Sequence, residues 1–209
     1  MKRAVVFDLD GTLWDTCAPV TEAWNRALAR LRVSRRVTVG EIRSLMGKTV
    51  PEIGALVFPD NTPAEQAALM DALGEEETAF LARNGGRLFD GLEDALDALS
   101  CPCMIVSNCQ SGYIEAFLAA HRLETRFADH ECSGRTGLSK GENIRLILER
   151  NGVGRAIYVG DTASDQAAAR YAGLPFVHAA YGFGAVEGAD GVIRSLRELP
   201  KLAETLFVE

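Results

Sequence analysis

The sequence predicts an α/β protein with a Rossmann-like, three-layer core around a parallel sheet and an all-helical cap domain inserted into that core. Two observations lead to this fold class. Apolar runs without polar alternation, at residues 4–7 and 156–159, are typical of strands covered on both faces of a parallel sheet. Beyond Gly91, such runs alternate with amphipathic helical segments, as they do in doubly wound sheets.

After the first strand the chain shows only helical periodicity. Apolar residues recur at three- and four-residue intervals from Val20 to Leu31, and three further segments also have the character of helices, namely 41–46, 51–57 and 63–83. No convincing strand lies among them. We therefore expect a helical cap formed by residues 15–84 and a catalytic core formed by residues 1–14 and 85–209.

The second part of the core is predicted as a series of alternating helices and strands. The expected helices are 92–99, 113–120, 141–150, 163–171 and one near 196–206, and the expected strands are 104–106, one near Phe127, 156–159 and 175–178.

Composition narrows the class of protein. Hydrophobic residues make up 47% and charged residues 24% of the 209 residues, as in a globular protein. The 29 acidic and 22 basic residues give a net charge of −7, which argues against a nucleic-acid partner. The apolar runs are too short to span a membrane, so we expect a cytoplasmic protein. We further expect it to be a monomer or a homodimer. The five cysteines include no Cys-x-x-Cys pair, which favours reduced thiols over a disulfide framework or a zinc site.

Two carboxylates directly follow the first strand, in Asp8-Leu9-Asp10-Gly11-Thr12. Open α/β sheets bind ligands at the carboxyl ends of their strands. Gly11 allows a sharp turn there and lets backbone N–H groups approach an anion. One such aspartate would be an ordinary cap or turn residue, but the pair indicates an active site.

Other polar residues follow the later strands. Ser107 and Asn108 come after strand 104–106, and Lys140 stands at a helix start. Asp161 comes after strand 156–159, and Asp165 begins the next helix. Capping and helix-dipole stabilisation are the alternative roles of these last two residues.

Carboxylates gathered at one edge of a sheet repel one another and any phosphate dianion, so such a site needs cations. Mg²⁺ fits best because it prefers oxygen ligands and is commonly held by one or two carboxylates together with a substrate phosphate.

In order and spacing, these residues resemble the four motifs of the haloacid dehalogenase-like hydrolase superfamily, from Asp8 to Asp165. The helical insertion after the first motif resembles its phosphoglycolate phosphatase-like branch. The resemblance implies a Mg²⁺-dependent phosphatase that hydrolyses a small phosphorylated metabolite through an aspartyl-phosphate intermediate. Asp10 excludes a dehalogenase, because members of that branch lack the second aspartate.

The resemblance also implies residue roles. Asp8 would be the nucleophile, and Asp10, oriented by Thr12, would be the general acid and base. The phosphoryl oxygens would be held by Ser107, Lys140 and the backbone amides of Leu9 and Asn108. Magnesium would be held by Asp8, the Asp10 carbonyl and Asp161, with Asp165 acting through water or by fixing Lys140.

The substrate is less well indicated. Gly141 and Phe89-Asp90-Gly91 depart from what is common in phosphoglycolate phosphatases. Lys48, between two cap helices, is the candidate substrate reader, although Gly47-Lys48 also fits a helix C-cap followed by a solvated lysine. Trp14 lines the entrance or packs the cap hinge. A phosphosugar mutase and a noncatalytic phosphate-binding module remain alternatives.

Overall fold

The computed structural model describes residues 1–208 and contains a six-stranded sheet with every neighbouring pair of strands parallel. The strand order is β5-β4-β1-β6-β7-β8, so the central strand is the first one in the sequence. The strands are β1 (Arg3–Phe7), β4 (Cys103–Ser107), β5 (Asp129–Cys132), β6 (Arg155–Gly160), β7 (Phe176–Ala179) and β8 (Gly191–Ile193).

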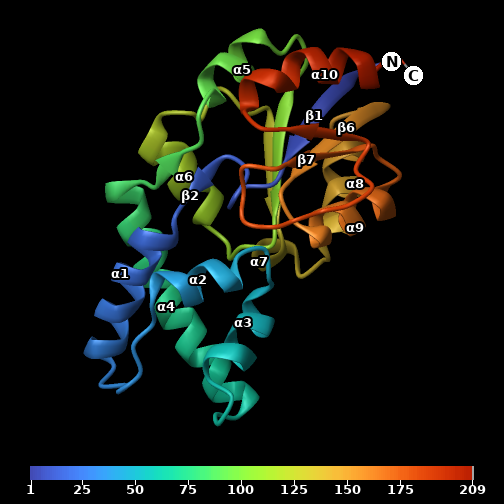
Figure 1. Ribbon diagram of the computed structural model, residues 1–209. Helices are drawn as coiled ribbons and strands as arrows, with labels where there is room; N and C mark the ends of the chain where they lie inside the picture. The colour runs from blue at the N-terminus through green and yellow to red at the C-terminus, as the bar shows by residue number, and fades with distance from the viewer. Residues whose placement is uncertain (209) are drawn as a thin grey trace.

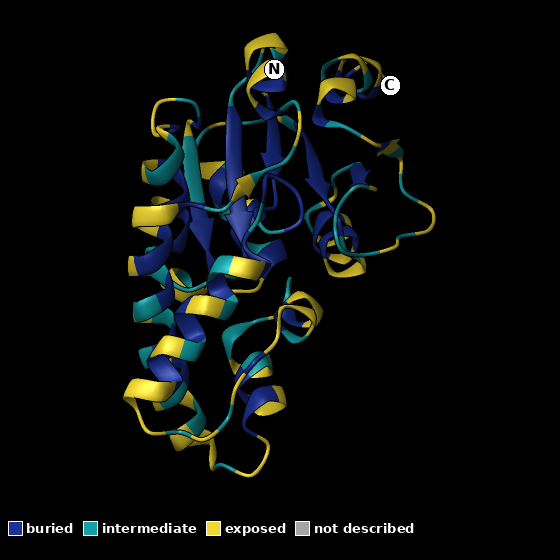
Figure 2. Cartoon of the chain, turned by 60° about the vertical axis from the view of Figure 1, so that its left-hand side comes forward, coloured by how far each residue is buried: buried dark blue, intermediate teal, exposed yellow. Residues whose placement is uncertain are grey.

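Helices cover both faces of the sheet, as a three-layer core requires. On β1, Val5 and Phe7 face one hydrophobic cluster, and Ala4 and Val6 face the other. The first cluster includes α5 (Leu92–Ala98), α6 (Tyr113–His121) and α10 (Leu199–Leu206). The second includes α8 (Lys140–Arg150) and α9 (Ala163–Ala172). The inner strands β4, β1, β6 and β7 are accordingly buried in Figure 2, whereas the edge strands β5 and β8 are partly exposed. The predicted core architecture is confirmed.

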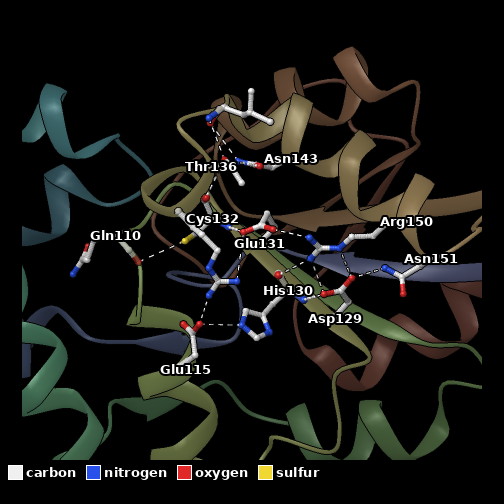
Figure 3. A network of polar contacts seen from close by, with 12 residues as sticks. Gln110, Glu115, Asp129, His130, Glu131, Cys132, Thr136, Asn143, Arg150 and Asn151 are labelled. Atoms are coloured by element: carbon white, nitrogen blue, oxygen red, sulfur yellow. Dashed lines mark hydrogen bonds and ion pairs between the residues drawn. The ribbon is translucent and has the colours of Figure 1, made fainter.

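Strand β5 forms one edge of the sheet and lies two residues beyond the position predicted near Phe127. Its sequence, Asp-His-Glu-Cys, is mostly polar, so hydrophobic periodicity does not reveal it. The strand is secured by ion pairs (Figure 3): the Arg150 guanidinium binds both carboxylate oxygens of Asp129, at 2.6 and 2.7 Å, and donates to buried Glu131 at 2.7 Å. The strand runs into the short helix α7 (Ser133–Thr136).

Four helices form a block at the carboxyl end of the sheet (Figure 1): α1 (Cys17–Arg30), α2 (Val39–Leu45), α3 (Val50–Val57) and α4 (Pro63–Asn84). Threonines begin the last three helices as capping boxes, each paired with a glutamate three residues later. The long helix α4 starts with Pro63 in its first turn and ends at Gly85, whose φ is +67°. Helix α4 packs against α1 and α6, so it joins the block to the core.

The two chain segments that connect the helical block to the core pair with each other. Strands β2 (Trp14–Asp15) and β3 (Arg87–Leu88), which were not predicted, form an antiparallel pair at the two ends of the helical block. Trp14 is fully buried, and its ring makes edge contacts with Tyr113 and Phe117. Of the two roles considered for Trp14, the structure supports packing of the hinge.

Two further short elements were not predicted: α7 and the edge strand β8. None of the helices within residues 1–208 is both long and apolar enough to cross a membrane. All five cysteines are free thiols.

Candidate active site

Asp8 lies at the carboxyl end of the central strand, where its backbone N–H donates to the Val159 carbonyl of β6 at 2.8 Å. Its side chain is almost fully buried. The chain then turns at Gly11, whose φ is +85°, and a side chain at Gly11 would clash with the Asp161 carboxylate. Glycine is therefore required both by the backbone conformation and by the space.

Three carboxylates meet beside this turn. One oxygen each of Asp8, Asp161 and Asp165 lies within 4.8 Å of the others, and all three residues are buried. Asp161 follows β6, and Asp165 caps α9 by accepting the Thr162 N–H and hydroxyl. The capping role foreseen as the alternative for Asp165 is thus present together with its place in the cluster.

A single ammonium group partly balances this cluster. Lys140, the first residue of α8, donates to Asp8 Oδ1 at 2.8 Å and to Asp165 Oδ1 at 2.7 Å. Both pairs are buried, so they are shielded little by solvent or salt. The sequence placed these residues at separate chain positions, and the fold brings them together.

Burial and mutual repulsion control protonation in the cluster. Burial raises the pKa of Asp8, and the Asp165 carboxylate adds to the rise, which Lys140 opposes. Burial raises the pKa of Asp161 to about 7, again reinforced by Asp165. For Lys140, burial lowers the pKa, but attraction to Asp165 and Asp8 outweighs it and the net pKa is raised. One fixed positive charge thus serves three carboxylates.

The cluster fits a divalent cation. Asp161 Oδ2 accepts the Phe183 N–H at 2.7 Å, whereas Asp161 Oδ1 is buried with no hydrogen-bond partner among residues 1–208. An unpaired buried carboxylate oxygen is costly. Gly182 also approaches this carboxylate so closely that a side chain there would clash with it. A hard cation with oxygen ligands would satisfy the free oxygen and offset the charge.

Asp10 lies two residues beyond Asp8, but its carboxylate is held away from this cluster. Its Oδ1 accepts the hydroxyls of Thr16 and Tyr113, each at 2.9 Å. Burial raises the pKa of Asp10 to about 6, against the opposing effect of these two hydrogen bonds.

Thr12 does not orient Asp10 in this structure, contrary to the prediction. Its buried hydroxyl has no hydrogen-bond partner among the described residues. Thr16 and Tyr113 hold the carboxylate instead. Sequence reasoning could not find Tyr113, because it lies 103 positions from Asp10 at the start of an ordinary amphipathic helix.

Ser107 and Asn108 follow β4, next to β1 in the sheet. The Ser107 hydroxyl accepts the Cys109 N–H at 3.3 Å. The Asn108 amide donates to the Gly47 carbonyl at 2.9 Å, across the junction between the core and the helical block. Leu9, the other residue whose backbone amide was predicted to bind phosphate, is fully buried.

A cavity of about 520 Å³ lies between the sheet end and the helical block. Asp8, Asp10, Ser107 and Asn108 line it from the core, and Lys48 lines it from the loop after α2. Gly47 has a φ of +80° just beyond the α2 C-cap, so the helix-ending role foreseen for it is also present. Lys48 therefore shares a cavity with both aspartates of the first motif.

Trp24 of α1 and Glu77 of α4 also line the cavity and were not among the predicted site residues. The Trp24 indole N–H donates to Glu77 Oε2 at 2.8 Å, and both side chains are buried. Glu77 belongs to a Glu-Glu-Glu run that resembles a solvated helix face. One signal was available: Leu73, Glu77 and Leu81 follow at four-residue spacing, which places Glu77 on the apolar stripe of α4.

Comparisons with known proteins agree with this arrangement. The sequence model of the haloacid dehalogenase-like hydrolase family matches residues 5–179. The plasmid-encoded phosphoglycolate phosphatase of Cupriavidus necator is 30% identical over 223 residues, covering 95% of this chain and 92% of that protein. The phosphoglycolate phosphatase of Xanthomonas campestris pv. campestris (strain 8004) is 31% identical over 188 residues, covering 87% of this chain and 84% of that protein.

Solved structures show the same fold. A haloacid dehalogenase-like family hydrolase from Streptococcus pneumoniae superposes with a TM-score of 0.81 at 21% identity, covering 98% of both chains. CbbY from Rhodobacter sphaeroides, solved in complex with phosphate, superposes with a TM-score of 0.79 at 24% identity, covering 95% of this chain and 96% of that one.

Proposed function

The chain belongs to the haloacid dehalogenase-like hydrolase family, in its phosphoglycolate phosphatase-like branch, and is a phosphoric monoester hydrolase; we propose that it hydrolyses a small phosphomonoester through an aspartyl-phosphate on Asp8, with Mg²⁺ as cofactor. The observation that carries this proposal is the buried Asp8 carboxylate, paired with Lys140 at the edge of a cavity that Asp10 also lines. A site for phosphate binding alone needs neither a nucleophile nor a second carboxyl group.

In the first step, an Asp8 carboxylate oxygen attacks phosphorus and the bond to the ester oxygen breaks. Attack requires ionised Asp8, which burial disfavours. The Lys140 ammonium opposes that effect from 2.8 Å and fixes the orientation of the carboxylate.

Asp10 supplies the proton for the leaving oxygen. Thr16 and Tyr113 both donate to Oδ1, so the acidic proton of Asp10 resides on Oδ2. With a pKa of about 6, Asp10 exchanges protons readily near neutral pH. In the second step the ionised Asp10 takes a proton from the water that attacks the aspartyl-phosphate, so inorganic phosphate is released and both residues are restored.

Charge stabilisation comes from several groups. Lys140, the Ser107 hydroxyl and the backbone amides of Leu9 and Asn108 would hold the phosphoryl oxygens. The metal would be held by Asp8, Asp161 and the Asp10 carbonyl, with Asp165 holding Lys140 in place. When bound, Mg²⁺ supplies positive charge to offset the carboxylates and the phosphate.

Residues 15–84 act as the cap domain on a core formed by residues 1–14 and 85–209. The cap provides the far wall of the cavity, including Lys48, so it contacts the part of the substrate that differs among phosphomonoesters.

A panel of phosphomonoesters incubated with the protein and Mg²⁺ tests the proposal by measuring inorganic phosphate. We expect phosphate release and a transient acyl-phosphate that is cleaved by hydroxylamine. Isomerised product without phosphate release would indicate a mutase, and neither phosphate nor phosphoenzyme would indicate a noncatalytic binding module. Either result contradicts the proposed hydrolase.

A further inference from the structure

The cap end of the cavity carries an unusual charge distribution. Helix α4 lines it with three acidic side chains, those of Asp71, Glu75 and Glu77. Lys48 is the one basic side chain among the described residues that line the cavity. A leaving group that itself carries a negative charge would therefore meet an excess of acidic groups here.

Glu77 is the most deeply placed of the three acidic residues. Only 8% of its surface is exposed, whereas Asp71 and Glu75 lie at exposed positions. Burial raises the pKa of Glu77 to about 8, against the opposing effect of the hydrogen bond from Trp24, and the nearby Asp10 carboxylate adds to the rise. A bound ammonium or hydroxyl group would stabilise the ionised form of Glu77, whereas a bound anion would oppose it.

Packing alone does not account for this residue. Glu77 occupies a position on the apolar stripe of α4 between Leu73 and Leu81, where a leucine would pack without the cost of burying a carboxyl group. The Trp24 indole N–H donates to Oε2, and the Gln110 amide lies close enough to lower the pKa of the same carboxyl group. Glu77 thus places a carboxyl oxygen in a chamber whose neighbouring wall is apolar, formed by Trp24, Met70 and other side chains.

A second polar side chain, Gln110, lies beside Glu77 and against Gly74 of α4, close enough to lower the pKa of Glu77. The Gln110 side chain lines the cavity from the core, and its buried Nε2 has no well-aligned hydrogen-bond partner among residues 1–208. Buried polar groups are ordinarily satisfied, so the Gln110 amide, next to the Glu77 carboxyl group, retains capacity to donate to a polar ligand in the chamber.

We propose that Glu77 is a specificity-determining residue that accepts a hydrogen bond from the leaving-group end of the substrate, so that the enzyme prefers phosphate esters of uncharged or amino alcohols over those of hydroxy acids. The ligand chemistry is a hydrogen-bond donor without negative charge, either a hydroxyl or an ammonium. The Gln110 amide donates to the oxygen of such a hydroxyl. This inference rests on the proposed phosphatase function.

A hydroxy acid fits the same chamber poorly. Its carboxylate would face Glu77 in a desolvated space, with Lys48 alone to compensate, and like charges placed together discriminate strongly. Protonated Glu77 could donate to that carboxylate, but Asp71 and Glu75 would still oppose it at the chamber wall. The relatives named phosphoglycolate phosphatases are named for an ester of a hydroxy acid, so this chain would differ from them in substrate.

Three two-carbon esters provide the test: 2-hydroxyethyl phosphate, 2-aminoethyl phosphate and phosphoglycolate. They share the phosphate and the chain length and differ only in the terminal group. For the wild-type enzyme we expect kcat/KM to be about tenfold or more higher for the better of the first two than for phosphoglycolate, a factor that corresponds to about 1.4 kcal/mol. Which of the two is better distinguishes a hydroxyl-bearing substrate from an ammonium-bearing one.

Glu77→Gln is the informative variant, because it keeps the volume and an oxygen to accept the Trp24 N–H but cannot ionise. We expect the ratio of kcat/KM for the better of the first two esters to kcat/KM for phosphoglycolate to fall about tenfold in this variant. The change should be mainly in KM, because Glu77 contacts the leaving group in both the ground state and the transition state. Glu76→Gln is the matched control on the same helix. Glu76 pairs with Arg30 outside the cavity, so this control should retain the wild-type ratio.

The outcomes separate the two proposals. Absence of phosphate release from these esters and from nitrophenyl phosphate would refute the phosphatase itself. Phosphate release with phosphoglycolate as the best wild-type substrate, a result that needs no variant, would overturn the role of Glu77 alone. An unchanged ratio in folded Glu77→Gln, verified by its thermal unfolding, would overturn it as well.

Discussion

The ammonium of Lys140 and the carboxylate of Asp8 lie 2.8 Å apart in the interior, although 132 positions separate them in the sequence. The pair joins the end of the central strand to the first turn of α8. Because both groups are buried, each depends on the other to remain charged.

Replacing Lys140 with methionine should destabilise the protein and abolish turnover. The substitution leaves Asp8 and Asp165 buried without their cation, and removing one partner of a buried pair costs roughly 3–5 kcal/mol. Urea unfolding measures the loss, with the exposed Lys201→Met as control. Added Mg²⁺ should restore part of the stability; an unfolding midpoint equal to that of wild type would show that the pair contributes nothing.

Asp8→Asn should eliminate turnover while the fold persists. The side chain keeps its volume and an oxygen for the Lys140 ammonium, but it loses the nucleophilic carboxylate. Removal of one charge from the crowded cluster relieves repulsion, so the unfolding midpoint without metal should equal or exceed that of wild type. Phosphate release and urea unfolding measure the two effects. Substantial phosphatase activity in the pure variant would exclude the aspartyl-phosphate route.

Removal of divalent metal should stop the reaction, and Mg²⁺ should restore it. Ca²⁺ should inhibit, because its larger and more variable coordination shell would misplace Asp8 for attack. Asp161→Asn should raise the Mg²⁺ concentration needed for half-maximal activity, since Asp161 supplies the unpaired buried oxygen. Metal titrations of phosphate release provide the measurement, and undiminished turnover in excess chelator would rule out a role for metal.

Much of the core could be predicted because its strands are continuous apolar runs and its polar residues stand at the strand ends. Asp8 and Asp161 were identified this way, and parallel pairing of β1 with β6 brings them to one edge. The remainder depends on contacts between distant segments. Strand β5 is polar and is secured by Arg150, so no local pattern marks it.

The partners of Asp10 show the same limit. Thr12 was the nearest hydroxyl in sequence, yet the turn at Gly11 leaves that hydroxyl without a partner and the next helix presents Thr16. Tyr113 reaches Asp10 only after α6 has packed against the core and α4. Composition and periodicity do not encode such a packing arrangement.

The free energy of unfolding should fall as the pH rises from about 5 to 8, and protonation of Glu77 should account for part of that fall. Its pKa is near 4.5 in the unfolded chain and about 8 in the fold, so over this interval the native state retains a proton that the unfolded state has released. Stability is therefore greatest below the unfolded pKa and declines by up to roughly 1.4 kcal/mol per pH unit until the folded pKa is passed. Urea unfolding of wild type and Glu77→Gln at several pH values isolates the effect. A difference in unfolding free energy that does not vary with pH would contradict the raised pKa.

Asp10→Ala provides the sharpest test of the mechanism, because it separates the two chemical steps. Without the acid, attack on an alkyl phosphate should slow severely, since its alkoxide leaves poorly without a proton. Nitrophenyl phosphate has a leaving group that is stable as an anion, so its first step should lose less than the ~10²–10⁴-fold typical of general acid–base catalysis.

Hydrolysis of the aspartyl-phosphate should be slow in this variant for both substrates, because Asp10 also activates the water. The aryl phosphate should therefore give a burst of nitrophenol and then stall as phosphoenzyme, which rapid-quench measurements would detect. Tyr113→Phe is the companion variant. It removes one of the two hydrogen bonds that lower the pKa of Asp10, so the pKa of Asp10 should rise. Because Asp10 is still present to activate the water, this variant should show no burst of nitrophenol. Equal first-step losses for the two substrates in Asp10→Ala, with no accumulated phosphoenzyme, would mean that Asp10 only supports the fold through Thr16 and Tyr113.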